Sequence, residues 1–279
     1  MADAYEEIRT WDQFRLRQSI RNGDYTAHTA GLARGTLQTN VAIMSAEHAL
    51  DFMRFCQRNP KPCPLVGVSD TGNPMMFTLG ADIDIRRDIP AYNIYRNGIL
   101  DAEQPDITDL WQDDFVAFAL GCSFTFERAL QAAAIPLWHI DNNTTVPMFR
   151  TNIETIAAGP FHGKTVVSLR MIDPSDVDRV VKISKNYPLA HGAPLHIGDP
   201  GQIGITDLSQ PEWGDPVSIK GDKVPVFWAC GVTPQVAIEA AKLPIFITHK
   251  PGHMLITDVH EQAEVPNHTT NPNQHGETS

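Results

Sequence analysis

The 279-residue sequence has little positive charge and no long apolar run. It contains 22 lysine and arginine residues against 33 aspartate and glutamate residues, a formal net charge of -11. No lysine- or arginine-rich block interrupts this balance, which argues against nucleic acid and anionic membranes as partners. No stretch approaches the roughly 20 apolar residues needed to cross a bilayer, and the charged start is no secretory signal. We therefore expect a cytoplasmic protein without membrane association.

Cysteine is scarce, and the familiar cofactor motifs are missing. The chain has four cysteines, Cys56, Cys63, Cys122 and Cys230. They show no CxxC spacing and are too few for a disulfide scaffold, so we expect reduced, mostly buried thiols. Neither a P-loop nor a GxGxxG fingerprint follows a predicted strand, and no GxSxG elbow indicates a serine hydrolase. The sequence thus predicts no cofactor.

Two histidine pairs lie in Gly/Pro-rich loops. His191 and His196 form one pair, with Asp199 just beyond it, and His249 and His253 form the other. Neither pair stands four residues apart on a helix, and no HExxH or Cys/His zinc spacing occurs, so we expect no bound metal. His191 and His249 are instead candidate acid or base groups, because an unperturbed imidazole titrates near neutral pH. The others are expected to bond to the loop backbone.

The most informative segment runs from residue 226 to residue 253. Its pattern predicts a buried strand over 226–229, a sharp turn at Gly231, a helix capped by Thr233 and a second strand. A helix that begins directly after a strand presents free backbone N–H groups and the positive end of its dipole. Cys230, Gly231 and Thr233 are therefore predicted to hold a carboxylate or phosphate. The alternative is an ordinary strand–helix–strand crossover that binds nothing.

Earlier segments add further elements. A helix capped by Ser45 is expected to end at Asn59, and the run 65–70 predicts a short strand. Asp70 lies at the carboxyl end of that strand, where ligands bind in open α/β sheets, so it is a candidate site carboxylate. Alternating apolar and polar residues over 80–86 predict a half-buried strand whose polar face meets solvent or a site.

A long helical stretch is expected from Thr108 or Asp109 to Ala134, interrupted at residues 121–127. Ser123 and Glu127 supply a hydroxyl and a carboxylate there that could hold a small polar substrate. The alternative is a kinked helix whose hydroxyl groups bond to the backbone.

The element order predicts the α/β class with one inserted piece. Residues 1–114 and 189–258 are assigned to an α/β core domain, and residues 115–188 to an inserted α+β subdomain. That insertion includes a strand over 165–172 and a helix after Asp173. Residues 259–279 are polar and lack periodicity, so they are assigned to a disordered tail.

Five separated segments, in the same order, resemble the D-glutamate cyclase family, whose bacterial members are named hydro-lyases. They are 33–40 (ARGTLQTN), 121–127 (GCSFTFE), 190–200 (AHGAPLHIGDP), 212–215 (EWGD) and 226–234 (VFWACGVTP), within a similarity that runs from about residue 8 to 258. The resemblance implies a three-layer α/β/α core with a smaller two-layer α+β subdomain. It also implies loss of water from D-glutamate to give 5-oxo-D-proline. Larger mitochondrial members carry a further C-terminal domain that this sequence lacks, so the cyclisation could belong to that domain.

This reaction needs a grip on the substrate carboxylates. Arg34 is our predicted bidentate clamp, with Gln38 and Asn40 as neutral donors beside it. A structural ion pair is the alternative for Arg34. Because nucleophile and electrophile belong to one molecule, holding the substrate curled supplies much of the barrier reduction.

The reaction also needs proton transfer. His191 and His249 are the predicted acid and base groups, with Asp70 or Glu127 as an orienting or general-base carboxylate. A thioester on a cysteine is conceivable, but a buried small apolar side chain is the better interpretation.

Three functions stay open at this point. The first is a cofactor-independent lyase acting on glutamate or a similar amino dicarboxylate. The second is a dehydratase of another small hydroxy acid, assisted by a metal in the histidine loops. The third is a non-enzymatic protein that binds a small anion. In each case the expected partner is a small anion, and assembly into a homo-oligomer is left open.

Overall fold

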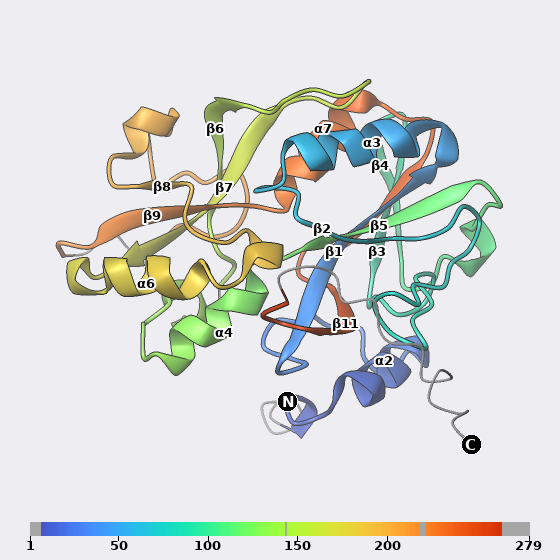
Figure 1. Ribbon diagram of the computed structural model, residues 1–279, viewed down its shortest axis with the longest axis horizontal. Coiled ribbons are helices and arrows are strands. Elements are labelled where there is room, and N and C mark those ends of the chain that lie inside the picture. The colour runs from blue at the N-terminus through green and yellow to red at the C-terminus, as the bar shows by residue number, and fades with distance from the viewer. Residues whose placement is uncertain (1–6, 143, 218–220, 264–279) are drawn as a thin grey trace, which may run out of the picture.

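The computed structural model describes residues 7–142, 144–217 and 221–263, which form two sheets and the helices around them (Figure 1). The α-helices are α2 (Gln13–Arg21), α3 (Ala46–Arg58), α4 (Phe124–Ala132), α5 (Trp138–Asp141), α6 (Val177–Ser184) and α7 (Val232–Ala241). The strands are β1 (Thr36–Ser45), β2 (Leu65–Val68), β3 (Tyr92–Arg96), β4 (Ile99–Gln104), β5 (Phe115–Gly121), β6 (Met148–Glu154), β7 (Lys164–Ile172), β8 (His196–Ile197), β9 (Val224–Ala229), β10 (Phe246–His249) and β11 (Leu255–His260). Short 3-10 helices are η1 (Thr108–Leu110), η2 (Pro174–Asp176), η3 (Pro188–Ala190) and η4 (Pro200–Ile203).

Both sheets are antiparallel in every strand pairing of the described residues. The larger sheet has the order β2-β5-β1-β10-β3-β4, and β11 also pairs with β1. The smaller sheet has the order β6-β7-β9-β8 and lies on the left in Figure 1, with α4 and α6 beneath it. The chain therefore has the mixed α/β class that the sequence predicts. The three-layer arrangement of the core stays a prediction.

Helix α3 covers one face of the larger sheet. It buries Phe52, Phe55 and Cys56 at helical spacing, and the Phe52 ring meets the edge of Phe118 on β5 at 4.9 Å between centroids. The predicted helix is confirmed, but its predicted core face, Ala46, Ala49, Leu50, Met53 and Cys56, is wrong apart from Cys56 and the partly buried Ala49: Leu50 is 52% and Met53 39% exposed. The predicted cap is different, because the Ser45 side chain makes no capping hydrogen bond.

The prediction of a strand over residues 80–86 is wrong. This segment forms turns, with an isolated bridge between Met75 and Asp84. Ile83 and Ile85 do point inward and are fully buried, so the alternation of apolar and polar residues was real. It arises from a compact turn structure that covers the other face of the larger sheet.

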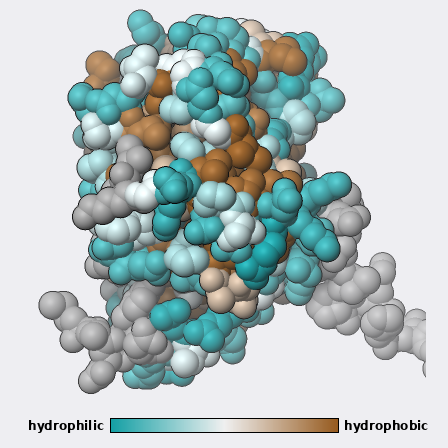
Figure 2. All heavy atoms as spheres, turned by 90° about the vertical axis from the view of Figure 1, so that its left-hand side faces the viewer, coloured by the Kyte–Doolittle hydropathy of each residue, from teal (hydrophilic) through white to brown (hydrophobic). Residues whose placement is uncertain are grey.

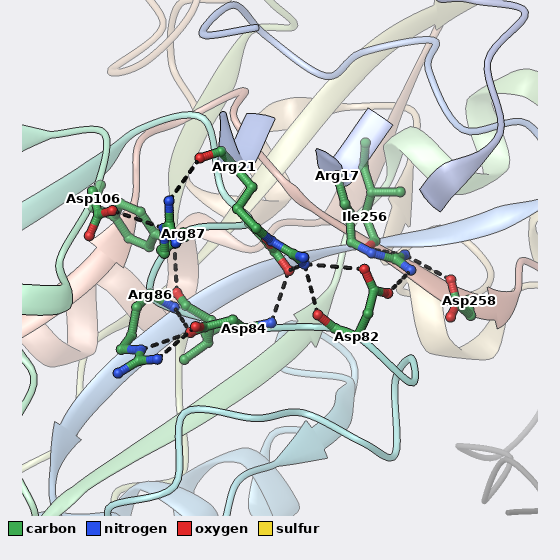
Figure 3. A network of polar contacts seen from close by, with 12 residues as sticks. Arg17, Arg21, Asp82, Asp84, Arg86, Arg87, Asp106, Ile256 and Asp258 are labelled. Carbon is green, nitrogen blue, oxygen red and sulfur yellow. Dashed lines mark hydrogen bonds and ion pairs between the residues drawn. The ribbon is translucent and has the colours of Figure 1, made fainter. Parts of the chain in front are cut away.

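The polar residues of the same segment bind α2 (Figure 3). Arg17 donates to Asp82 at 2.5 Å and to Asp258 on β11 at 2.7 Å. Arg21 donates through two nitrogens to Asp88, both at 2.7 Å. Arg17 is 1% exposed, so these pairs are shielded from solvent and fasten α2 to the sheet. The polar face of the segment is thus a structural ion-pair network.

The prediction of a long helix from residue 108 or 109 to residue 134 is wrong in its first part. Residues 115–121 form β5, a strand between β1 and β2 in which every residue is buried. An apolar run buried on both faces lacks alternation, and periodicity alone does not separate it from a buried helix. The second part of the prediction is confirmed as α4, although Ser123 makes no side-chain cap there.

The segment that predicted a strand–helix–strand crossover connects the two sheets. β9 belongs to the smaller sheet and β10 to the larger, with α7 between them. The predicted domain boundary between residues 114 and 115 stays a prediction. The strand pairing does not follow that boundary, because β5 lies in the larger sheet, while β8 and β9 join β6 and β7 in the smaller one. The predicted tail, 259–279, lies largely outside the described residues.

Figure 2 views the side of the molecule that carries the smaller sheet, and a hydrophobic stretch crosses an otherwise hydrophilic surface there. Ile197 on the edge strand β8 is 41% exposed, among the larger exposures of apolar side chains. None of the described helices is both long and apolar enough to cross a bilayer.

Candidate active site

Asn40 on β1 connects two strand-to-helix turns, one from each sheet. Its side-chain nitrogen donates to the carbonyl oxygen of Gly121, at the end of β5, at 2.9 Å. The same side chain lies against Gly231, the residue before α7, where an added Cβ would come within 2.4 Å of the Asn40 nitrogen. Only glycine fits there. The turns that carry Cys122 and Cys230 therefore meet at Asn40.

A buried ion pair lies beside these turns. Glu127 on α4 accepts from Arg170 on β7, with Nε at 3.1 Å and Nη2 also in contact, and His139 Nε2 lies 3.0 Å from the same carboxylate oxygen. Arg170 also donates to Ser168 at 2.8 Å and to Ser123 at 3.2 Å. Arg170 is 3% exposed and Glu127 4%. The guanidinium thus links both sheets.

The charge of Glu127 is fixed by this setting. Burial acts to raise the pKa of its carboxyl, but the charges of His139 and Arg170 and their hydrogen bonds lower the pKa to about 2. A carboxylate with so low a pKa is a weak base at neutral pH. Glu127 contacts Arg170 and His139, and neither of the histidines that the sequence paired with it is among its side-chain partners in the described residues.

The two serines next to Arg170 keep donor capacity. A guanidinium only donates, so the oxygens of Ser123 and Ser168 accept from Arg170. Within the described part of the chain no acceptor receives either hydroxyl hydrogen. Ser123, Asn40 and Cys122 are 7–9% exposed, and Cys230 is more exposed, so solvent reaches the edge of the cluster. Ser168 is fully buried, so of the two hydroxyl groups only that of Ser123 lies at the edge that solvent reaches.

His191 reaches the cluster from the segment after η3. The carbonyl oxygen of Leu189 lies so close to Gly121 that an added Cβ there would sit 1.5 Å away, which places this segment against the Cys122 turn. His191 Nδ1 is 2.9 Å from the carbonyl oxygen of Lys61. A carbonyl only accepts, so Nδ1 carries the hydrogen and Nε2 keeps its lone pair.

The imidazole of His191 is neutral at physiological pH. Burial lowers its pKa to about 4, and the positive charges of Arg170 and Lys61 act in the same direction, against a raising contribution from the Lys61 carbonyl. The residue has a φ of 73°, a left-handed conformation. A neutral ring with a free Nε2 lone pair can accept a proton, but the lowered pKa makes it a weaker base than a free imidazole. Its role as a catalytic base stays a prediction.

His249 serves the larger sheet. Its Nδ1 accepts from the backbone N–H of Val41 at 3.1 Å, which fastens β10 to β1. Burial lowers its pKa to about 4, and the neighbouring charge that acts on it is that of His253. The structure therefore does not bring His249 to Arg170.

Other predicted site residues lie elsewhere. Gln38 donates to the carbonyl oxygens of Thr29 and Leu32, both at 3.0 Å, and so holds the segment before β1. Thr233 accepts from the backbone N–H of Val166 at 2.9 Å. That bond fixes the start of α7 to β7, and the helix begins at Val232 without a side-chain cap.

Asp70 and Arg34 are also apart from the cluster. β2 runs antiparallel to β5, so its carboxyl end lies beside the amino end of β5, and Cys122 follows the opposite end. Asp70 is exposed there. Arg34 is exposed and lines an open cavity of about 790 Å³ together with Arg9, Arg128 and Glu261. Asn40, Ser123, Glu127, His191, Cys230 and Gly231 are the predicted site residues that the structure brings together.

Sequence reasoning missed Arg170, Ser168 and His139. Ser168 and Arg170 stand two residues apart in the apolar part of β7, residues 166–172, so they share one face of the strand. Two polar side chains on one face of a buried strand are a signal for a buried polar site, and it was available. His139 lies on the short helix α5 and carried no signal. In the ranges that the structure describes, no three His, Cys, Asp or Glu side chains gather as metal ligands.

The two buried histidines predict an acid-sensitive fold. His191 and His249 stay neutral when folded, with pKa values near 4 in place of 6.5, so below pH 6.5 the unfolded chain binds more protons. Stability is therefore expected to fall as the pH drops from 6.5 to 4, by roughly 3 kcal/mol for each histidine. Glu127 adds a second loss between pH 4.5 and 2. Urea denaturation across this range measures the effect, and His249→Gln should weaken the first phase. A constant free energy of unfolding from pH 7 to 4 would contradict it.

Comparisons with known proteins bear on the same segments. The family model described as D-glutamate cyclase matches residues 116–258, which include both cysteine turns, Arg170 and His191. A protein named "Putative hydro-lyase" from Dinoroseobacter shibae is 63% identical, with 98% of this chain and 93% of that protein covered. A protein of the same description from Ruegeria pomeroyi is 64% identical, with 95% of this chain and 97% of that protein covered.

A solved structure, that of a nitrogen repressor-like protein from Methanococcus jannaschii, aligns with this chain at 12% sequence identity. The alignment covers 84% of this chain and 91% of that chain. Its TM-score is 0.37, which is too low to support an inference. The family model spans half of this chain and the bacterial relatives nearly all of it. The chain therefore belongs to the D-glutamate cyclase family, and it is an enzyme of the carbon–oxygen lyase class.

Proposed function

We propose that this chain removes water from D-glutamate to form 5-oxo-D-proline, without a cofactor, at the cluster around Arg170. The observation that carries the proposal is the arrangement of a buried guanidinium, a serine donor and a neutral histidine beside two helix starts. Together they offer positive charge for a carboxylate and a lone pair for a proton. Family membership supplies the choice of substrate.

The carboxylates of the substrate would bind where donors are free. The hydroxyl group of Ser123 can donate to a carboxylate while its oxygen still accepts from Arg170. The positive end of the α7 dipole lies at the Cys230 turn and adds a second attraction for a carboxylate. A substrate held by both ends is curled, which brings its amine close to its side-chain carboxyl group and lowers the entropic part of the barrier.

The chemistry then needs one proton removed and one delivered. The substrate reacts with its amine neutral and its side-chain carboxyl group protonated. The amine loses one proton as its nitrogen attacks the carboxyl carbon, and we assign this proton to Nε2 of His191. The tetrahedral oxyanion is stabilised by the Ser123 hydroxyl group and the positive end of the α7 dipole. The protonated imidazole returns the proton to the departing hydroxide, which leaves as water. The lactam and one water molecule account for all atoms.

Proton NMR of the purified chain with D-glutamate, L-glutamate and 5-oxoproline tests this function. We expect the D-isomer to be consumed and 5-oxoproline to accumulate at the same rate before and after treatment with a chelator. Chelator-sensitive dehydration of another hydroxy acid would favour a metal-assisted dehydratase. Saturable binding of glutamate without any product would favour a binding protein. Either result would overturn the proposal.

A variant of Arg34 tests which of two locations binds the substrate carboxylate, the cluster around Arg170 or the open cavity beside Arg34. Arg34 faces the open cavity and not the Arg170 cluster. With the substrate at the cluster, Arg34→Ala is expected to leave KM for D-glutamate within about twofold of the original value. A rise in KM corresponding to about 2–5 kcal/mol would instead show that Arg34 clamps the substrate, as the sequence predicted.

A further inference from the structure

The two cysteine turns are built alike. Cys122 directly follows the last residue of β5 and precedes the first residue of α4 by two positions. Cys230 has the same offsets from β9 and α7. In each turn the backbone N–H three residues after the cysteine donates to the cysteine carbonyl oxygen, at 3.2 Å from Thr125 and 3.0 Å from Thr233. The sequence shows the match as C-x-x-T in both places.

The surroundings of the two thiols match as well. Each thiol receives a backbone N–H from the residue two positions later, the first of its helix. The residue two positions before each cysteine pairs with a polar residue on the neighbouring strand. Leu120 pairs with Asn40, and Trp228 pairs with Ser168. The smaller sheet therefore repeats the thiol setting of the larger one.

The two thiol settings adjoin each other. Asn40 contacts both turns, and the charge of each of Arg170 and Glu127 acts on both thiols. Within the described residues, the Asn40 side-chain oxygen has no hydrogen-bond partner, although the residue is 8% exposed. This acceptor lies against Gly231 and is available to a ligand donor such as an amine or ammonium group.

We propose that Cys122 and Cys230 are paired proton-transfer groups for the α-carbon of an amino acid or its lactam, so that the enzyme also interconverts enantiomers. The choice of glutamate and 5-oxoproline as substrates rests on the proposed function. One sulfur, as thiolate, takes the α-hydrogen as a proton and becomes a thiol, and the electron pair passes into the adjacent carboxyl group. The other thiol donates its proton to the opposite face and becomes the thiolate. No oxidant or reductant takes part.

The two thiols are not equal at rest. Burial raises the pKa of Cys122 to about 12 and that of Cys230 to about 11. Cys230 is also the more exposed of the two and receives N–H groups from both Gly231 and Val232. Cys230 is therefore the sulfur that gives up its proton first, and Cys122 is the first proton donor.

Incubation of the full chain in D₂O with 5-oxo-D-proline, or with D-glutamate, tests this inference. We expect the L-enantiomer to form with deuterium at its α-carbon, while the remaining D-substrate keeps its hydrogen at early times. Chiral chromatography separates the two enantiomers, and mass spectrometry measures the deuterium content of each. This pattern distinguishes two proton-transfer groups from one, because a single group would exchange its proton with solvent and label both enantiomers.

Single substitutions locate the groups. Cys122→Ser and Cys230→Ser should each reduce interconversion by at least about 100-fold, because a hydroxyl is a far weaker acid than a thiol. Cys56→Ala, which removes a buried thiol from the α3 core, is the matched control and should not change the rate per folded molecule. Folding of each variant is checked by circular dichroism.

The outcomes separate this inference from the proposed function. Lactam formation without any α-deuteration in the wild-type chain would overturn the inference and leave the function standing. α-Deuteration without lactam formation would overturn the proposed function and leave the inference standing. Interconversion that survives either serine variant would show that the thiols are not the proton-transfer groups. The wild-type labelling pattern decides the matter even if a variant does not fold.

Discussion

Replacing Arg170 with methionine is expected to lower the free energy of unfolding by about 3–5 kcal/mol. The substitution keeps much of the apolar stem but removes the guanidinium, so Glu127 stays buried with His139 as its remaining partner. A buried carboxylate that loses its main counter-charge carries the desolvation cost that the pair had offset. The cation that lies over the rings of Phe126 and Trp228, at 5.2 and 5.1 Å, is lost as well.

Urea denaturation monitored by circular dichroism measures this change. The double variant Arg170→Met, Glu127→Gln should recover part of the loss, because no unpaired charge is left in the interior. Arg54→Met is the matched control: its pair with Asp51 is exposed, and removing it should cost less than about 1 kcal/mol. A loss below 1 kcal/mol for Arg170→Met itself would mean that water already reaches Glu127.

Replacing His191 with asparagine is expected to reduce the rate of 5-oxoproline formation by about 100- to 10,000-fold. Asparagine suits this position for two reasons. It tolerates the left-handed backbone that His191 adopts, and its side-chain N–H₂ can donate to the Lys61 carbonyl as Nδ1 does. The variant therefore retains the fold and lacks the Nε2 lone pair to which we assign the amine proton.

His196→Gln is the control for this experiment. His196 is the first residue of β8, five positions after His191, and its Nε2 lies 2.7 Å from the carbonyl oxygen of Asp199, a bond that a glutamine side chain can replace. We expect kcat and KM of that variant to stay close to the original values. If His191→Asn kept full activity with an unchanged fold, the general base would have to be another group of the cluster.

Much of the secondary structure could be predicted from local patterns. α3, α6 and α7 show apolar stripes between clear start and stop signals, and β2 and β7 are short apolar runs with turn residues before them. β5 could not be predicted this way, since a strand buried on both faces has no alternation to distinguish it from a helix. Pairing partners are not encoded locally either.

The candidate site shows the same division. The turn residues Cys230, Gly231 and Ser123 were identified because helix starts have recognisable sequences. Asp70 was placed at the site by a rule for parallel sheets, and the antiparallel pairing of β2 with β5 puts it at the other end of that strand. Arg34 was chosen for its chemistry, without information on where the segment before β1 lies. Long-range arrangement, not residue type, decides which of these groups meet.

The path of the chain from β9 through α7 to β10 has a consequence for assembly. Half of the polar cluster is attached to one sheet and half to the other. Along the sequence, Glu127 and Ser123 are 43 and 47 residues from Arg170, and Ser168 is two residues from it. Neither sheet by itself would hold the guanidinium, the imidazole and both sulfurs together. Catalytic competence should thus arise late during refolding, after the backbone signal of each sheet has already returned.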